Sequence, residues 1–316
     1  MRPRVVMLVA FLIAAVAVGF TGAHFTLLPS SPPVVRESLP PTPDSYLGAF
    51  ENGSPPSYQP IAEFARAAGR TPDLAGYYSG WAEAFQTSYA QMIRKHGVIP
   101  FVQIDPTLAS VSGIAAGDYD LYLRTYADSV RNFGHPVVIG FGHEMNAPWY
   151  SWGYGKLPAS TFIAAWQHIV TLFRAQGADN VTWLWTLQAD ETGTGPVEDW
   201  WPGTTYVTWV GIDGYYVRPS DTFANVFGKT IDQVRAFTDK PVLLSETAVG
   251  PAAGQALKIP DLFTGMHEYK TLGLVWFDKT NGTLLHQDWR IEDSPPPVQY
   301  LFRLGVRRDL TRTRPQ

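Results

Sequence analysis

Short apolar runs alternate with longer amphipathic stretches from Tyr46 onward, and no low-complexity linker interrupts them. Apolar runs of four to eight residues bounded by turn residues are typical of buried strands. The eight runs that predict strands are Tyr46–Phe50, Leu74–Tyr78, Val98–Ile104, Val137–Gly142, Val181–Leu187, Trp209–Tyr215, Val242–Ser245 and Leu274–Phe277. The stretches that predict helices between them include Ala82–Lys95, Asp118–Phe133, Pro158–Gln176, Thr222–Thr238 and Pro260–Thr271.

Strands that are apolar on both faces favour parallel pairing with helices covering the sheet. Eight strand–helix units in about 260 residues match an α/β fold of the (β/α)8 TIM-barrel type. The alternative is a doubly wound open sheet, which usually carries a Gly-rich phosphate turn after its first strand. Residues 50–55, Phe-Glu-Asn-Gly-Ser-Pro, do not form such a turn. The pattern therefore favours the closed barrel.

Polar residues stand at the ends of the predicted strands, where the catalytic groups of barrel enzymes are found. These strand-end residues are Glu51, Ser79, Asp105, His143, Glu144, Gln188, Asp213, Tyr215, Glu246 and Asp278. A carboxylate follows an apolar strand repeatedly in this set. The sequence thus predicts an acidic site at the carboxyl-terminal mouth of the barrel.

Glu144 and Glu246 each close a nearly charge-free strand, the fourth and the seventh of the predicted set. No basic residue lies within ten positions after Glu144, and Glu246 has only Lys240 nearby, which argues against local structural ion pairs. In a barrel both side chains can point into one mouth, where burial and mutual repulsion separate their pKa values. One carboxyl can then act as an acid and the other as a nucleophile or base, the division that glycoside hydrolysis needs.

The composition and one motif argue against several other kinds of functional site. The 316 residues contain no cysteine, which excludes disulfides, thiolate metal sites and Cys nucleophiles. A formal net charge of −4 gives no reason to expect nucleic acid as a partner. His143-Glu144 lacks the second histidine of a zinc-binding His-Glu-x-x-His motif, because position 147 is Ala. We expect no metal and no cofactor in the catalytic site.

The segment around Glu144 resembles a known family. His143–Trp152, which reads HEMNAPWYSW, resembles the acid/base signature of glycoside hydrolase family 26, the β-mannanase family. Ser245-Glu246 falls where that family has its nucleophile, Gly211–Tyr215 is similar to its strand-six Asp-x-Tyr, and Trp276 takes the place of its strand-eight tryptophan. Asp288–Ile291 is also similar to a segment that follows strand eight in bacterial members.

The resemblance implies a retaining (β/α)8 enzyme and a role for each matching residue. Glu144 would be the acid/base and Glu246 the nucleophile. Five further residues would form the substrate-binding set, with Tyr215 holding Glu246, Asp213 orienting its neighbours, His143 contacting a sugar hydroxyl or the nucleophile, and Trp149 and Trp276 offering stacking faces to sugar rings.

The substrate that the resemblance implies is β-1,4-mannan, cleaved internally along the chain. Two departures from the family pattern qualify this: Gly140–Gly142 replace an arginine-containing stretch before His143, and Ala147 stands where Gly is usual. The Trp149 run also resembles the branch of the family that cleaves mixed-linkage glucan. The alternatives are therefore a β-1,3-1,4-glucanase or xylanase of the same fold, or a polysaccharide-binding barrel with weak catalysis.

The two ends of the chain predict export. Residues 1–28 begin with Arg2 and Arg4 before an apolar run, as in a signal peptide or an N-terminal membrane anchor. Residues 29–44 contain six prolines and predict an extended linker. The catalytic barrel would span residues 45–305, and residues 306–316 would be a basic tail. We expect a monomer that is secreted or anchored outside the cytoplasm, with a possible membrane tether at its N-terminus.

Overall fold

The computed structural model describes residues 39–189, 193–281 and 287–310. Residues 1–28, assigned above to a signal peptide or anchor, lie outside the described residues, as does most of the Pro-rich linker. Cleavage, tethering and export therefore remain predictions. Within the described part of the chain, every helix is too short or too polar to cross a bilayer.

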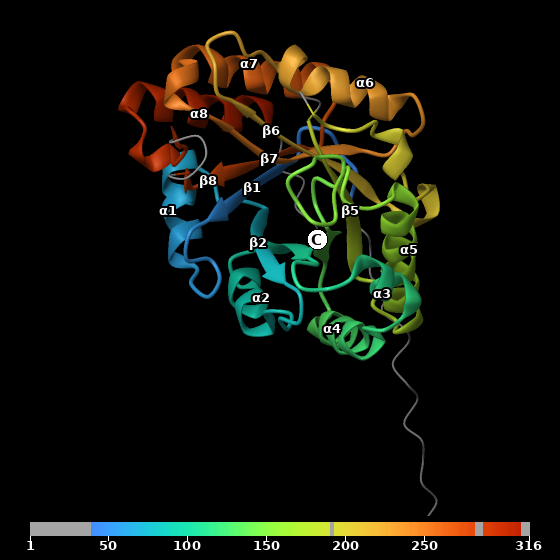
Figure 1. The fold of residues 1–316 in the computed structure, drawn as a ribbon. Coiled ribbons are helices and arrows are strands. Elements are labelled where there is room, and N and C mark those ends of the chain that lie inside the picture. Colours follow the sequence, from blue (N-terminus) through green and yellow to red (C-terminus); the bar gives the residue numbers. More distant parts are fainter. Residues whose placement is uncertain (1–38, 190–192, 282–286, 311–316) are drawn as a thin grey trace, which may run out of the picture. The chain divides into compact units, whose positions relative to one another are not determined.

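Eight parallel strands close into a barrel in which each strand pairs with its sequence neighbours and the last pairs with the first (Figure 1). The strands are β1 (Tyr46–Glu51), β2 (Leu74–Gly80), β3 (Ile99–Asp105), β4 (Val137–Phe141), β5 (Val181–Gln188), β6 (Trp209–Tyr216), β7 (Val242–Val249) and β8 (Gly273–Asp278). All eight predicted strands are present. The structure confirms the (β/α)8 TIM barrel.

Helices follow the strands and cover the outside of the barrel (Figure 1). The α-helices are α1 (Gln59–Ala68), α2 (Thr87–Arg94), α3 (Val111–Ala116), α4 (Asp120–Phe133), α5 (Ala159–Ala175), α6 (Lys229–Arg235), α7 (Gln255–Glu268) and α8 (Pro296–Asp309). Shorter elements are the π-helix η3 (Ala224–Gly228), the 3-10 turns η1 (Glu198–Trp200), η2 (Thr204–Tyr206), η4 (Pro251–Ala253) and η5 (Ile291–Asp293), and the small strands β9 (Thr280–Asn281) and β10 (Gln287–Asp288).

One predicted helix boundary differs because of a proline. The sequence pattern places Pro260 at the start of a helix, but α7 begins at Gln255, directly after Gly254 with its positive φ of 84°. Pro260 therefore lies inside the helix, where it lacks an N–H for one backbone hydrogen bond. The helix thus begins earlier than the proline predicts, although proline is most common in the first turn of a helix.

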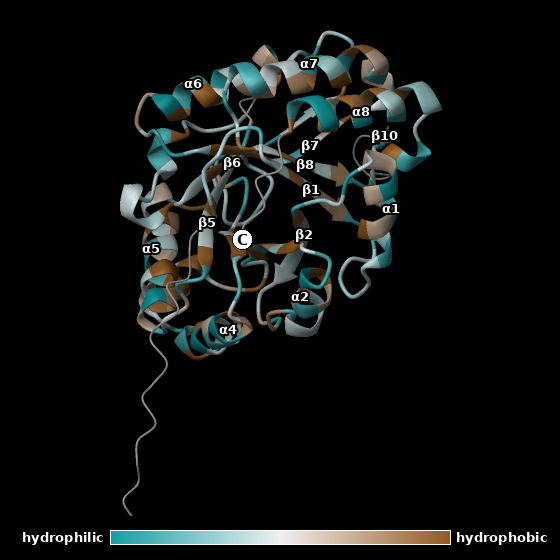
Figure 2. Cartoon of the chain, turned by 180° about the vertical axis from the view of Figure 1, so that it is seen from behind, coloured by the Kyte–Doolittle hydropathy of each residue, from teal (hydrophilic) through white to brown (hydrophobic). Residues whose placement is uncertain are grey.

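Buried apolar side chains lie on both faces of the eight barrel strands, as the near-continuous apolar runs predict. Figure 2 shows hydrophobic residues along these strands. Tyr46, Phe50, Phe101 and Leu243 belong to the layer inside the barrel. A much larger layer fills the space between the barrel and its helices. Because side chains alternate along a strand, neighbouring residues fall into different layers, as Val275 and Trp276 of β8 do.

The folded body extends beyond the predicted limits of 45 and 305 at both ends. Leu39 is buried, and the carbonyl of Pro40 accepts a hydrogen bond from the hydroxyl of Tyr46 at 2.8 Å. At the other end α8 continues to Asp309 and buries Val306. The predicted boundaries of the linker and the tail are therefore wrong. The prolines and arginines of these segments suggested an extended linker and a solvated tail, but apolar residues within them pack on the barrel.

Candidate active site

A β-bulge in β7 brings Glu246 to the mouth of the barrel. Ile212 of β6 pairs with Leu244 of β7, but the next residue, Asp213, pairs with Glu246, so β7 carries one extra residue at this point. A bulge re-aims the side chains of the bulged strand. As a result, both Ser245 and Glu246 hydrogen-bond to residues of the barrel interior, although they are adjacent in sequence.

Two tyrosine hydroxyls hold the buried carboxylate of Glu246. Tyr215 donates to Oε2 at 2.6 Å, and Tyr78 donates to Oε1. The sequence predicts the Tyr215 contact, whereas it gives no reason to choose Tyr78 from the Tyr77-Tyr78 pair of β2. The strand alternation decides this, because Tyr77 packs in the outer layer and Tyr78 in the inner one.

Glu144 lies just after β4 with a backbone conformation unusual for a side chain of its size. Its φ is +54°, and its N–H donates to the carbonyl of Thr186 at 2.9 Å. Non-glycine residues in this region cost about 1 kcal/mol or more and cluster at functional sites. The Glu144 carboxyl is 7% exposed, and its Oε2 accepts a hydrogen bond from Trp149 Nε1 at 2.6 Å. Trp149 itself is 47% exposed and can offer its ring face to a ligand.

The loop that carries Glu144 and Trp149 is fixed to β5 by a reciprocal pair of hydrogen bonds. Asn146 Nδ2 donates to the carbonyl of Gln188 at 2.9 Å, and the N–H of Gln188 donates to Asn146 Oδ1 at 2.8 Å. Both residues are buried. A buried amide that is satisfied in this way rigidifies the backbone on either side of it.

The charges of both glutamates act on His143. Its Nδ1 lies 2.8 Å from Asp105 Oδ1 and its Nε2 lies 3.0 Å from the hydroxyl of Tyr150, while its ring centroid is 5.4 Å from that of Tyr78. Burial lowers the pKa of His143, but the negative charges of Asp105, Glu144 and Glu246 outweigh burial and raise this pKa to about 9. Both glutamates therefore act on one imidazolium, which places them in the same mouth.

Asp213 of β6 is the register partner of Glu246 and is enclosed by protein rather than open to a ligand. It is 0% exposed, and its Oδ1 accepts a hydrogen bond from the hydroxyl of Ser245. Burial, followed by the charges of Glu246 and Glu144, raises the pKa of Asp213 well above its ordinary value. Because Asp213 is fully buried, it has no open face for a substrate, which corrects its place in the predicted substrate-binding set. Its hydrogen bond with Ser245 fits the orienting role that the resemblance implies.

Trp276 does not reach the mouth of the barrel. Its ring is 0% exposed and packs against Phe302 of α8, and its Nε1 donates to the carbonyl of Trp289 at 2.8 Å. The predicted stacking role is wrong because Trp276 is an outward position of β8. The next residue, Phe277, faces inward and packs against Tyr215 and Trp289.

Lys279 is a residue of the mouth that the sequence does not single out. Its ammonium lies 4.9 Å from the ring centroid of Tyr78 and 5.2 Å from that of Phe277, a cation–π arrangement. Burial lowers its pKa, while the charges of Glu246 and Glu51 act in the opposite direction. A strand-end position after Asp278 is the one sequence signal that could have identified it.

These residues form a site with two carboxyls in different environments. Two tyrosine hydroxyls donate to Glu246, and the indole of Trp149, whose ring is partly exposed, donates to Glu144. Asp105, His143 and Lys279 set the charge around them. Among the described residues, a carboxylate group able to hold a metal lies elsewhere, at the ends of β1 and β8.

The different positions of Trp276 and Trp149 lead to a testable difference in stability. Trp276→Ala removes a fully enclosed ring, so we expect a loss of about 3–5 kcal/mol in the free energy of unfolding. Trp149→Ala removes a half-exposed ring and should cost less than about 1 kcal/mol. Denaturant unfolding of both variants measures this, and equal losses would contradict the two placements.

The pKa of His143 gives a pH dependence. Because this pKa is raised from 6.5 to about 9, protonated His143 stabilises the fold fully below about pH 6.5, and this stabilisation is lost as the pH rises through 9. NMR titration of the imidazole should give a midpoint near the raised value. Asp105→Asn keeps the hydrogen-bond acceptor but removes its charge, so the midpoint should fall. A wild-type midpoint at the ordinary value would contradict the interaction.

Comparisons with known proteins agree with this site. Residues 103–295 match glycosyl hydrolase family 26. Endoglucanase H of Acetivibrio thermocellus is 29% identical over 266 residues, which cover 79% of this chain and 29% of that protein. The mannan endo-1,4-beta-mannosidase A and B of Caldalkalibacillus mannanilyticus is 24% identical over 53% of this chain and 30% of that protein. The chain spans less than half the length of the curated relatives it matches.

Solved structures show the same fold. A Bacillus subtilis mannanase superimposes with a TM-score of 0.63 at 20% identity, covering 86% of this chain and 87% of that one. The match over residues 103–295 includes both glutamates and the strands that carry them. From this match and the barrel fold together, we conclude that the chain belongs to glycosyl hydrolase family 26.

Proposed function

We propose that this protein is a retaining endo-β-glycanase in which Glu246 is the nucleophile and Glu144 the acid/base. The observation that carries the proposal is the placement of two buried carboxyls just after β4 and on β7, where the charges of both act on His143 in one barrel mouth. Two tyrosine hydroxyls donate to the two oxygens of Glu246, and the indole N–H of Trp149 donates to Glu144. The tyrosine hydrogen bonds fix the rotamer of Glu246, which a nucleophile needs for its attack.

The first step forms a covalent glycosyl-enzyme. An oxygen of Glu246 attacks the anomeric carbon while the bond from that carbon to the glycosidic oxygen breaks, and Glu144 gives its proton to the leaving oxygen. The indole N–H can only donate, so the Glu144 oxygen it contacts, Oε2, acts as an acceptor.

The second step returns the enzyme to its starting state. Ionised Glu144 removes a proton from water, the resulting hydroxide bonds to the anomeric carbon, and the ester bond to Glu246 breaks. Tyr78 and Tyr215 hold the departing carboxylate in the same rotamer for the next cycle.

The substrate in this proposal is a β-linked polysaccharide. Trp149 supplies an exposed aromatic face beside the acid/base, which suits the apolar face of a sugar ring. The family resemblance favours β-1,4-mannan. A β-glucan is the second candidate, because the relative that matches 79% of this chain is an endoglucanase by name. Relatives named beta-1,3-xylanase, at 23% identity, keep xylan as a third possibility.

The two glutamates should fail in different ways when removed. Glu246→Ala should lose at least about 10³-fold in kcat on every substrate while still binding polymer, because the nucleophile is needed in each cycle. Glu144→Ala should keep glycosyl-enzyme formation on aryl glycosides whose leaving group needs no proton, so a burst of released phenol should appear. Rapid-quench kinetics and polymer affinity gels measure both.

A polymer-binding barrel without catalysis predicts another outcome for the same proteins. Wild type and Glu246→Ala would then bind equally and release no sugar. NMR of the first product reports its anomeric configuration. An inverted configuration would contradict the double displacement, although the protein would still be a hydrolase.

Substrate choice is tested on a panel of mannan, mixed-linkage β-glucan and xylan. We expect release of reducing ends from mannan, with a rapid fall in viscosity because the cleavage is internal. If only mixed-linkage glucan is cleaved, the mannan prediction is wrong and the endoglucanase-like alternative holds. The Glu246→Ala protein serves as the matched control for contaminating activity.

A further inference from the structure

Three carboxyl groups meet where the first and last strands of the barrel join. Glu51 ends β1, Asp278 ends β8, and the two are register partners across that seam. Glu292, from η5, completes the group, and one oxygen from each residue lies within 4.8 Å of the others. Glu51 is 5% exposed and Asp278 is 0% exposed, whereas Glu292 is half-buried.

Oxygens of this group are buried without a hydrogen-bond donor from the rest of the protein. Glu51 Oε1, Asp278 Oδ2 and Glu292 Oε2 accept from no backbone or side-chain donor outside the group, and Asp278 interacts with the carboxyls of Glu51 and Glu292. The other oxygen of Asp278 accepts from the N–H of Ile291 at 2.7 Å. Buried polar atoms in folded proteins are nearly always paired with protein, water or an ion, because an unpaired one costs several kcal/mol when charged. The unpartnered oxygens therefore point to a missing electropositive ligand.

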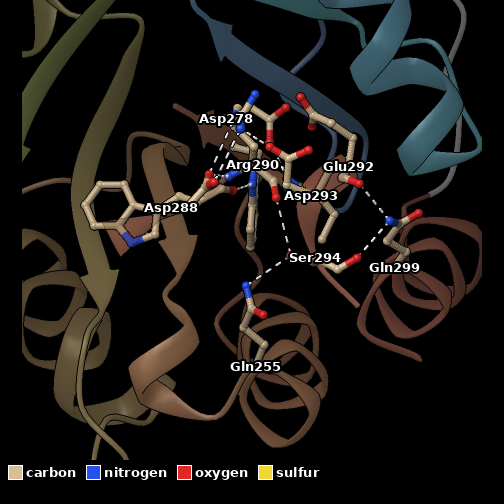
Figure 3. Close-up of polar contacts among 11 residues, drawn as sticks. Gln255, Asp278, Asp288, Arg290, Glu292, Asp293, Ser294 and Gln299 are labelled. Atoms are coloured by element: carbon tan, nitrogen blue, oxygen red, sulfur yellow. Dashed lines mark hydrogen bonds and ion pairs between the residues drawn. The ribbon is translucent and has the colours of Figure 1, made fainter. Parts of the chain in front are cut away.

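Among the described contacts, no basic side chain forms an ion pair with the three carboxyls, although the charge of Lys279 acts on Glu51. Arg290 lies between Asp288 and Asp293, pairing with Asp288 Oδ1 at 3.3 Å and with Asp293 (Figure 3). Lys279 places its ammonium over aromatic rings of the barrel mouth. Burial raises the pKa of Glu51 to about 8 and the pKa of Asp278 well above its ordinary value.

We propose that Glu51, Asp278 and Glu292 bind one divalent cation, and that Ca²⁺ is the ion they suit. All three ligands are carboxylate oxygens, which hard cations prefer, and no imidazole or thiolate is present to favour zinc. Oxygens bound to one Ca²⁺ at about 2.3–2.6 Å lie up to about 5 Å apart, in agreement with the observed spacing. Water at the half-buried Glu292 side can complete the coordination.

The consequence is structural rather than catalytic. The cation ties the end of β1 to the end of β8 and to η5, whose Glu292 carbonyl accepts a hydrogen bond from Gln299 of α8 at 2.8 Å (Figure 3). It thereby fastens the closing seam of the barrel and the last helix. The proposal does not rest on the glycanase assignment, because its measurements are binding and stability.

The experiment uses purified protein stripped with EDTA and dialysed against metal-free buffer near pH 7. Calorimetric titration with CaCl₂ should give one ion per chain, and millimolar Ca²⁺ should raise the midpoint of thermal unfolding. Glu292→Gln and the nearly isosteric Asp278→Asn should each weaken Ca²⁺ binding by about tenfold or more. Asp288→Asn, which changes an acidic residue outside the group, is the matched control and should bind as wild type does.

Three results would overturn the proposal. One is the absence of both binding heat and a change in unfolding midpoint with Ca²⁺. Another is Ca²⁺ binding of wild-type strength in Glu292→Gln and in Asp278→Asn, which would place the ion elsewhere. The third is a wild-type unfolding midpoint that does not respond to Ca²⁺ while Glu292→Gln is more stable than wild type, which would mean that the group shares protons instead. Tighter binding of Mg²⁺ or Mn²⁺ than Ca²⁺ would overturn the choice of ion.

Discussion

The alternation of side chains along eight closed parallel strands decides which residues can reach the site. Inward and outward positions alternate along each strand. The residue next to an inward-facing one therefore ordinarily points outward, towards the helices. The bulge in β7 is the exception on which the site depends. It allows Ser245 to donate a hydrogen bond to Asp213 while the adjacent Glu246 accepts from Tyr78 and Tyr215. Without the extra residue, strict alternation would turn Glu246 towards the helices.

The barrel mouth gathers carboxylates that would repel one another if all were charged. Three features reduce this repulsion: the pKa of Asp213 is raised, His143 is protonated beside Asp105, and the charges of Lys279 and Glu246 act on each other. Tyrosine hydroxyls supply the remaining hydrogen bonds without adding charge. The environment of each carboxyl thus differs, and such differences allow two chemically identical groups to take different roles.

Residues distant in the sequence meet at both ends of the seam between β1 and β8. At one end the Arg70 guanidinium donates to the carbonyls of Ser45 and Leu310, each at 3.0 Å, and so joins the start of the barrel to the end of α8. At the other end lie Glu51, Asp278 and Glu292. Arg70 and Leu310, like Glu51 and Asp278, are more than two hundred positions apart, so they meet only when the barrel has closed.

Local patterns in the sequence were sufficient for the eight strands, for the barrel and for the two glutamates, because apolar runs and strand-end carboxylates are local signals. They were not sufficient for Trp276, whose direction depends on strand register, nor for Tyr78 and Lys279, which contribute through partners from distant strands. Nor could they place the ends of the folded body, since Leu39 and Val306 are identified as core only by what they touch. The sequence by itself determined which groups stand at the ends of the strands. Only the tertiary structure decided which way each one points and what charge surrounds it, because both depend on register and burial between residues far apart in the chain.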